Sequence, residues 1–301
     1  MDVSIIIPSY DTQDTIEATL DQLQKQMPTT CETEVLVVDC SNHNEVERKV
    51  AGYDFVKFHR EQTRFNPGIG RNIGANLASG KLLVFIDADV ELGDGAINAA
   101  WQHYQQGAKI FGGALELNPR TSIGVASYIE HYYFNSESQA ARPASDRKNL
   151  SSAFMCFDKQ LFLTEGGFKD IPRMQDTELT EGLRAKGYAL KFFPDMLGLQ
   201  TQDSPLKKVL KKIYINGQNL YYIRYQRRAN TLRKVAFAVA LPVIMLVKIA
   251  RIVGRHLVYQ RPIDKLRTVA LSPLLLICGG YWMMGFYQAM ISESGISKAR
   301  H

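Results

Sequence analysis

The chain has 301 residues, of which 46% are hydrophobic, so it can bury one large core or two ordinary ones. Residues 1–205 contain 19 Lys or Arg and 28 Asp or Glu, a net charge of −9. Residues 206–301 contain 17 Lys or Arg and only 2 Asp or Glu, a net charge of +15. An acidic part is thus joined to a strongly basic C-terminal part, which is typical of proteins that contact nucleic acid or an anionic membrane.

The four cysteines are scattered, and none belongs to a Cys-x-x-Cys pair. This spacing argues against a zinc site or a disulfide framework and favours a reducing compartment. At the N-terminus, no basic segment precedes a long apolar stretch, so we expect no signal peptide.

Short apolar or β-branched runs predict five strands in the acidic part, at residues 3–7, 34–38, 55–58, 82–86 and 109–111. Apolar residues recur at helical spacing over 16–27 and again over 73–77, where Gly80 follows as the expected C-cap. This alternation predicts an α/β fold with a mostly parallel sheet and helices on both faces. In such sheets, ligands bind beyond the carboxyl ends of the strands.

Polar residues stand at three of these strand ends. Residues 8–11 follow the first strand, Asp39 follows the second, and Asp87 and Asp89 follow the fourth. In an extended segment residues i and i+2 point to the same side, so the last two carboxylates can converge on a hydrated divalent cation. A turn with solvated acids would also explain this pair taken alone. Three polar ends at one sheet edge predict a single polar site.

Two common nucleotide-binding classes are disfavoured. A Rossmann dehydrogenase needs a glycine-rich turn directly after the first strand, and the residues there are Pro-Ser-Tyr-Asp. The glycines of 68–74 are spaced G-x-G-x-x-x-G and follow the third strand by ten residues, so we expect a loop that enters a helix. The chain also lacks a Walker A loop.

The order and spacing of these motifs resemble the family 2 glycosyltransferases of the GT-A fold, over about 200 residues. The matching segments are 3–10, 35–39, 70–75, 85–89 (the family's DxD), 166–170, 175–179 and 183–188. The resemblance implies an inverting hexosyltransferase that takes a sugar from a nucleoside diphosphate, with a UDP-sugar favoured. It also implies a Mn²⁺ or Mg²⁺ cofactor.

The resemblance also implies roles for single donor-binding residues. Pro8, Ser9 and Tyr10 match the loop around the donor's base and ribose. Asp39 matches the acid that hydrogen-bonds the nucleobase, and Arg71 matches a residue near the nucleotide.

Three further acids match the family's reactive groups. Asp87 matches the first DxD acid, near ribose and metal, and Asp89 matches the acid that ligates the metal on the diphosphate. Asp176 matches the catalytic base. The metal stabilises charge on the leaving phosphate, while the base removes the acceptor's proton. A second interpretation is that Asp176 caps a helix over 177–186, which ends at Gly187.

Two positions depart from the family pattern. Gln175 stands where a Glu is usual, and 192–200 contains no His where many members have a metal ligand. Gln200 lies near that point, and its carbonyl oxygen is a poorer ligand for Mn²⁺ than imidazole. The third metal ligand is therefore left open.

The basic part divides into two segments. Residues 206–234 carry nine Lys or Arg, four Tyr and no acid, which predicts a basic amphipathic interfacial segment. Residues 268–292 contain no charge over 25 positions, enough to span a bilayer. The uncharged stretch 235–247 has only 13 residues, which favours an interfacial helix. Two shallow helices, two buried helices of a soluble bundle, or binding of single-stranded nucleic acid are the alternatives.

We therefore expect a catalytic domain over 1–205, an interfacial segment over 206–234 and membrane-associated helices over 235–301. The predicted function is transfer to a lipid-linked glycan or surface polysaccharide precursor at the cytoplasmic face of a bacterial inner membrane. Residues 128–147 and 149–157 are expected to contact the acceptor, and no nucleic-acid partner is expected. The alternatives are a glycosyltransferase with a soluble acceptor and a nucleotide-sugar-binding protein on a degenerate scaffold.

Overall fold

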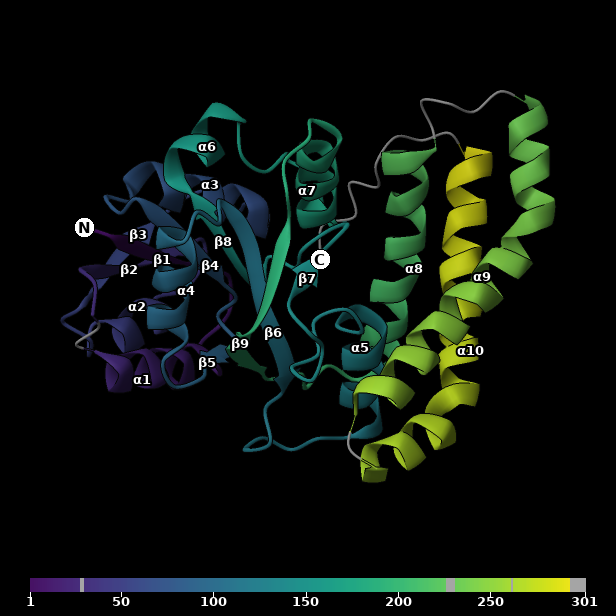
Figure 1. The fold of residues 1–301 in the computed structure, drawn as a ribbon, viewed down its shortest axis with the longest axis horizontal. Helices are drawn as coiled ribbons and strands as arrows, with labels where there is room; N and C mark the ends of the chain where they lie inside the picture. The colour runs from purple at the N-terminus through teal and green to yellow at the C-terminus, as the bar shows by residue number, and fades with distance from the viewer. Residues whose placement is uncertain (28–29, 226–230, 261, 293–301) are drawn as a thin grey trace. The chain divides into compact units, whose positions relative to one another are not determined.

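The computed structural model describes residues 1–27, 30–225, 231–260 and 262–292 (Figure 1). The chain forms two compact units. The first contains Met1–Thr121, Ser138–Asp170 and Gln175–Thr201. The second contains Ser122–Glu137, Ile171–Met174 and the described residues from Gln202 onward.

The first unit holds one nine-stranded sheet. Its strands are β1 (Val3–Ser9), β2 (Thr33–Asp39), β3 (Val56–Arg60), β4 (Leu82–Ile86), β5 (Val90–Leu92), β6 (Ile110–Leu117), β7 (Ser145–Asp146), β8 (Phe154–Asp158) and β9 (Lys191–Gln200). The spatial order is β3-β2-β1-β4-β8-β6-β9-β5, and β7 pairs with β9. The four strands from β3 to β4 are parallel, and β8 begins the mixed half of the sheet with an antiparallel pairing.

Six helices belong to the same unit: α1 (Ile16–Gln26), α2 (Glu45–Val50), α3 (Pro67–Leu77), α4 (Ala96–Gln105), α6 (Lys159–Thr164) and α7 (Gln175–Ala185). They cover both faces of the sheet because strand side chains alternate between two cores. Ile5 and Ile7 pack with the core that includes α1, α2 and α4, while Ile6 packs with α3, α6 and α7. The predicted α/β architecture, a mostly parallel sheet with helices on both faces, is confirmed for the first unit.

Several local predictions change. Strands β5, β7, β8 and β9 were not predicted, and β1 extends to Ser9, so Pro8 and Ser9 are strand residues rather than loop residues. The segment of residues 67–77 is itself helical, so the glycines of 68–74 lie within α3 rather than in a loop before it.

Gly80 is not the predicted helix C-cap, because α3 ends at Leu77 with Ala78 as the cap. Its N–H donates to Ser4 Oγ at 2.8 Å, and a Cβ at this position would lie 2.6 Å from the backbone of β1. Glycine is therefore required here by the close approach of two chain segments. Gly187, in contrast, lies two residues beyond the end of α7 at Ala185 and has φ +94°, as expected for a glycine that terminates a helix.

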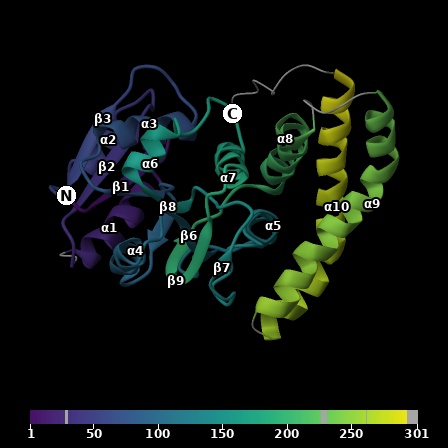
Figure 2. The same cartoon turned by 45° about the horizontal axis from the view of Figure 1, so that its top comes forward.

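The second unit is helical. It consists of α5 (Val125–Phe134), α8 (Leu206–Arg224), α9 (Thr231–Tyr259) and α10 (Pro262–Ser292). Helix α10 packs against both α8 and α9 (Figure 2). Gly217 on α8 and Gly285 on α10 allow the closest approach, since a Cβ on either would lie 2.0 Å from a backbone oxygen of the other helix. The aromatic helix α5 shares the core of this unit, through Ile129, Tyr132 and Tyr133.

Helices α9 and α10 present large apolar side chains to the outside. The exposed ones are Val235, Val239, Val243, Leu246, Val247, Val258, Ile263, Leu266, Val269, Leu276, Ile277, Tyr281, Met284 and Ile291. An exposed apolar surface of this extent marks contact with a membrane or another protein.

Among the described residues, two helices are long and apolar enough to cross a membrane, at Lys234–Tyr259 and Pro262–Ser292. The first apolar segment is part of a longer helix than the sequence pattern indicated, so its length no longer argues against a span, and its interfacial placement stays a prediction. Its 13 uncharged residues form only part of a 29-residue helix that continues past Lys248 and Arg251. The predicted segment ended at the first charged residue, because only uncharged residues were counted. A helix can continue through a charged residue whose side chain packs against neighbouring helices.

Candidate active site

The carboxyl ends of β1, β2 and β3 bring three polar residues into register. Ser9 lies beside Asp39 across β1 and β2, and Asp39 lies beside Arg60 across β2 and β3. This adjacency follows from parallel pairing, which places successive strand ends at one edge. Arg60 was missed because the third strand was predicted to end at Phe58. The rule that located the other strand-end residues would have found it with the strand extended by two residues.

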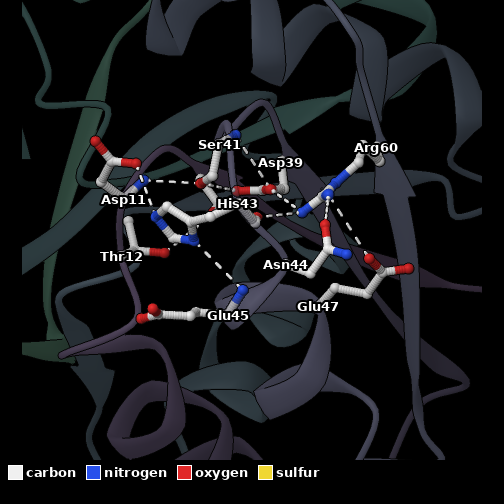
Figure 3. A network of polar contacts seen from close by, with 10 residues as sticks. Asp11, Thr12, Asp39, Ser41, His43, Asn44, Glu45, Glu47 and Arg60 are labelled. Carbon is white, nitrogen blue, oxygen red and sulfur yellow. Dashed lines mark hydrogen bonds and ion pairs between the residues drawn. The ribbon is translucent and has the colours of Figure 1, made fainter.

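Asp39 is completely buried and holds the centre of a polar network (Figure 3). Its Oδ1 accepts hydrogen bonds from the hydroxyls of Ser9 and Ser41, both at 2.7 Å. Its Oδ2 accepts from the Ser41 N–H and from Arg60 Nη2, both at 3.2 Å. The ion pair with Arg60 offsets the cost of burying the carboxylate. A nucleobase N–H that binds Asp39 must replace one of these donors.

The loop beside this network carries further polar groups. Arg60 Nη2 also donates to the His43 carbonyl at 2.7 Å, and His43 Nε2 lies 3.1 Å from Asp11 Oδ1 (Figure 3). The Arg64 guanidinium lies 4.0 Å from the centre of the Tyr10 ring. Tyr10 is half-buried, so its other surface can stack on a planar base or ribose.

Arg71 and Asp87 form an ion pair at the end of β4. The Arg71 side chain is only 2% exposed, whereas that of Asp87 is 35% exposed. Because Arg71 lies in α3 and Asp87 follows β4, the pair joins two of the predicted donor-binding segments. The Asp87 carboxylate keeps its second oxygen for a ligand while its charge is partly balanced.

Asp176 is placed near the same pair. The predicted N-cap position is wrong, because α7 begins at Gln175 and Asp176 lies in its first turn. The carboxylate still accepts from first-turn and neighbouring N–H groups, those of Thr177 at 2.6 Å and Ser152 at 3.3 Å. Asp87 and Arg71 both act on it electrostatically.

Burial raises the pKa of the Asp176 carboxyl, and the like charge of Asp87 acts in the same direction. The N–H groups of Thr177 and Ser152 and the Arg71 cation lower this pKa but do not cancel the effect of burial. A carboxylate with a raised pKa is a stronger base, which suits proton abstraction.

Asp89 and Gln200 meet at the pairing of β5 with β9. Gln200 Nε2 lies 3.3 Å from Asp89 Oδ1, and the Thr201 N–H donates to the Asp89 carbonyl at 2.9 Å. The residue at the position of the usual His is therefore in contact with Asp89.

The family model for Glycosyl transferase family 2 matches residues 4–158, just over half of the 301 residues. The chain belongs to this family. The matched range contains Asp39, Asp87 and Asp89, while Asp176 and Gln200 lie beyond it.

Two curated relatives of this family 2 glycosyltransferase agree. Glycosyltransferase AglE of Haloferax volcanii is 27% identical over 256 residues, which cover 81% of this chain and 80% of the relative. An uncharacterized glycosyltransferase of Haemophilus influenzae is 36% identical over 88 residues, 29% of each chain. The protein is a glycosyltransferase, and these relatives do not specify its sugar.

The fold of this chain resembles those of several solved structures. The mannosyltransferase PcManGT of Pyrobaculum calidifontis, in complex with GDP-Man and Mn²⁺, has a TM-score of 0.64 at 18% identity and covers 97% of this chain and 88% of its own. TarS 1–349 of S. aureus, in complex with UDP-GlcNAc, has a TM-score of 0.54 at 16% identity, with coverage of 97% and 91%. At these identities the likeness shows the GT-A fold.

The donor set of this family 2 glycosyltransferase fits a hard divalent cation. Asp89, Asp87 and the Gln200 amide offer oxygen atoms, which Mg²⁺ and Mn²⁺ prefer. Within the described ranges, no group of three or more His, Cys, Asp or Glu side chains could hold a metal by itself. A cation would therefore take its remaining ligands from a diphosphate and water, as is usual for Mg²⁺ at phosphate sites.

Replacing Gln200 with His is expected to lower the Mn²⁺ concentration needed for half-maximal transfer, because imidazole is a better Mn²⁺ ligand than an amide. A shift of about tenfold corresponds to about 1.4 kcal/mol of metal binding. The measurement is a Mn²⁺ titration of transfer rate, with Gln24→His, at an exposed position of α1, as the control for an added surface imidazole. An unchanged Mn²⁺ requirement would place residue 200 outside the coordination shell.

Proposed function

We propose that this protein transfers a sugar from a nucleoside diphosphate sugar, with UDP-sugars first to be tested, onto a hydroxyl of a lipid-linked glycan or surface polysaccharide precursor. The observation that carries the proposal is the position of Asp176. Its carboxylate has a raised pKa and interacts electrostatically with Asp87 and Arg71. Asp87 follows the end of β4, and Arg71 forms an ion pair with it. The interaction of a candidate base with the Arg71–Asp87 ion pair supports the proposal that all three residues serve one site.

In the proposed reaction, Asp176 accepts the proton of the acceptor hydroxyl as that oxygen attacks the sugar C1. The bond from C1 to the donor phosphate breaks, and the diphosphate leaves with the electron pair. Attack opposite the leaving group inverts the anomeric centre. A divalent metal held by Asp89, with Asp87 nearby, would supply stabilisation of the negative charge on the leaving diphosphate.

Arg71 has a positioning task in this scheme. Its guanidinium pairs with Asp87 and, at the same time, lowers the proton affinity of Asp176. It therefore keeps Asp176 ionised enough to accept a proton, while burial keeps that carboxylate basic. The stretch 149–157 contributes the Ser152 N–H to the Asp176 carboxylate, which supports its predicted place near the acceptor.

The test is a transfer assay with the full chain in native-like membranes, using UDP- and GDP-sugars with Mn²⁺ or Mg²⁺ and a lipid-linked acceptor fraction. Sugar incorporation into lipid that requires Asp176 would support the proposal. Incorporation into short soluble acceptors alone would favour a soluble-acceptor enzyme. Donor binding without transfer or hydrolysis would favour a degenerate binding protein.

The proposed location is the cytoplasmic face of a bacterial inner membrane, where nucleotide sugars are available. Two observations support membrane contact: the exposed apolar faces of α9 and α10, and the +15 charge of residues 206–301. On α8, Lys207, Lys208 and Lys211 are exposed near the N-terminal end. Each basic side chain close to an anionic bilayer contributes about 1 kcal/mol of attraction.

Changing these three α8 lysines to Gln is expected to reduce the preference of the full chain for anionic over neutral vesicles by up to roughly 100-fold. The measurement is partitioning into vesicles of phosphatidylcholine with and without phosphatidylglycerol. The matched control replaces Lys25, Lys148 and Lys191, which are exposed on the first unit, and changes the net charge equally. Equal losses in both variants would mean that only total charge matters and that α8 does not face the membrane.

A further inference from the structure

Lys248 lies on α9 between two aromatic rings of the second unit. Its Nζ is 4.5 Å from the ring centre of Tyr133 on α5 and 4.4 Å from the ring centre of Trp282 on α10. Tyr133 is 5% exposed and Trp282 is 2% exposed, so both rings are rigid parts of the core. Cation–π attraction stabilises the ammonium here but does not neutralise it.

Each of these three side chains carries a hydrogen-bond donor. The Tyr133 hydroxyl and Trp282 Nε1 are both buried without a hydrogen-bond partner among the described residues. Among the described residues, Lys248 makes no ion pair with a carboxylate. The charged residue that acts on it electrostatically, Arg224, is also a cation. An ammonium and an indole N–H can only donate, and a phenol readily donates. Buried donors of this kind are costly unless an acceptor is supplied, so the cluster is suited to an anion.

Exposed apolar side chains on the same two helices define the rest of the ligand. Val243, Leu246 and Val247 are exposed on α9 within five residues of Lys248. Ile277 and Met284 are exposed on α10 on either side of Trp282. A ligand that places an anionic group at Lys248 and lies along these faces must be amphiphilic. Ionisable residues within apolar helices commonly mark such a functional site.

We propose that Lys248, Tyr133 and Trp282 bind the phosphate group of a membrane lipid. The ammonium pairs with the phosphate, the phenol and indole donate to its oxygen atoms, and the acyl or prenyl chains lie on the exposed faces of α9 and α10. This inference rests on the membrane association in the proposed function and adds a lipid-binding site to it. Its chemistry suits either a bulk phospholipid or the phosphate of a lipid-linked acceptor.

The test uses the fluorescence of Trp282 in the full chain. The protein has 2 tryptophans, and Trp101→Phe removes the other, which stacks on Tyr104 in the first unit. The chain is placed in neutral phosphatidylcholine nanodiscs and titrated with phosphatidic acid, polyprenyl phosphate, diacylglycerol and inorganic phosphate. Phosphatidic acid or polyprenyl phosphate should change the emission saturably, whereas diacylglycerol and inorganic phosphate should not at equal concentration. Tighter binding of polyprenyl phosphate than of phosphatidic acid would identify the acceptor as the source of the phosphate.

Lys248→Met keeps the length of the side chain and removes the charge. It is expected to weaken binding of the phospholipid probe roughly 10- to 100-fold, the worth of one charge-assisted hydrogen bond. Lys248→Arg should retain most of the binding, and Lys25→Met, an exposed lysine of α1 in the first unit, should retain all of it. Far-ultraviolet circular dichroism and donor binding establish that each variant is folded.

Three results would overturn the inference. They are equal binding by Lys248→Met, an equal response to diacylglycerol, and saturation by inorganic phosphate at the same concentration as the lipid. Because binding is read without turnover, its failure leaves the transfer reaction standing. Conversely, lipid binding without any sugar transfer would refute the proposed function and leave this site intact.

Discussion

Replacing Asp176 with Asn is expected to reduce turnover by about 10²–10⁴-fold, the usual worth of general-base catalysis, while donor binding survives. Asn has the same shape and can still accept from the Thr177 or Ser152 N–H, but it cannot take up a proton. The measurement is kcat for transfer beside the Kd for the nucleotide donor. Thr180→Val, on the same helix, is the control for disturbance of α7, because Thr180 Oγ1 donates to the Asp176 carbonyl.

The same substitution should make the protein more stable at neutral pH. Burial raises the folded-state pKa of Asp176 above its unfolded value, so ionisation destabilises the fold at any pH above the folded pKa. The destabilisation disappears as the pH falls below the unfolded pKa. We therefore expect Asp176→Asn to raise Tm at neutral pH and to leave Tm nearly unchanged in acid. A variant that turns over normally but unfolds more easily would show that Asp176 serves only the helix.

The pH dependence of transfer should also reflect the raised pKa of Asp176. The base must be ionised in the free enzyme, so kcat/KM should fall on the acid side at a pH above the ordinary range of an aspartate. An acid limb at the pH of an ordinary exposed carboxyl would contradict the assignment of Asp176 as the base.

Replacing Asp89 with Ala is expected to abolish transfer and to remove the metal dependence of donor binding, with the fold retained. Asp89 follows the central strand β4 and contacts Gln200, so its loss removes the carboxylate expected to hold the cation on the diphosphate. The measurement is donor affinity with Mn²⁺ and with EDTA, beside the transfer rate.

The control is Asp54→Ala, which removes an exposed acid of the first unit and should leave both quantities unchanged. Full transfer by Asp89→Ala in excess EDTA would refute metal-assisted catalysis in this protein. Loss of transfer with an unchanged metal dependence would instead assign the cation to Asp87.

The sequence by itself was sufficient to predict the strands of the parallel half of the sheet and the polar residues at the ends of those strands. β1, β2 and β4 are apolar runs that stop at polar residues, and this local pattern does not depend on distant contacts. The alternation of strands with helical segments also predicted that helices would cover both faces of the sheet. The family assignment followed because Asp39 and the DxD acids stand at fixed places in this pattern.

Tertiary structure decided which residues complete the site. Arg60 reaches Asp39 only through the register of β3 on β2, and Gln200 reaches Asp89 only through the pairing of β9 with β5. Asp176 acquires its raised pKa from burial beside Asp87, although 89 positions separate them in the chain. None of these contacts is local. The sequence can mark Arg60 and Gln200 as candidate residues, but composition and periodicity do not specify which side chains they contact.

In the second unit, too, some features are visible in the sequence and others appear only in the folded structure. The charge of the basic part and its two apolar segments are visible in the sequence, but the inclusion of α5 in that unit is not. Helix α5 packs its aromatic residues against α8, α9 and α10, so a boundary at 205 would divide one core. Lys248 ends an uncharged run in the sequence, whereas in the fold it lies against Tyr133 and Trp282, because packing of three separate helices brings those rings to it.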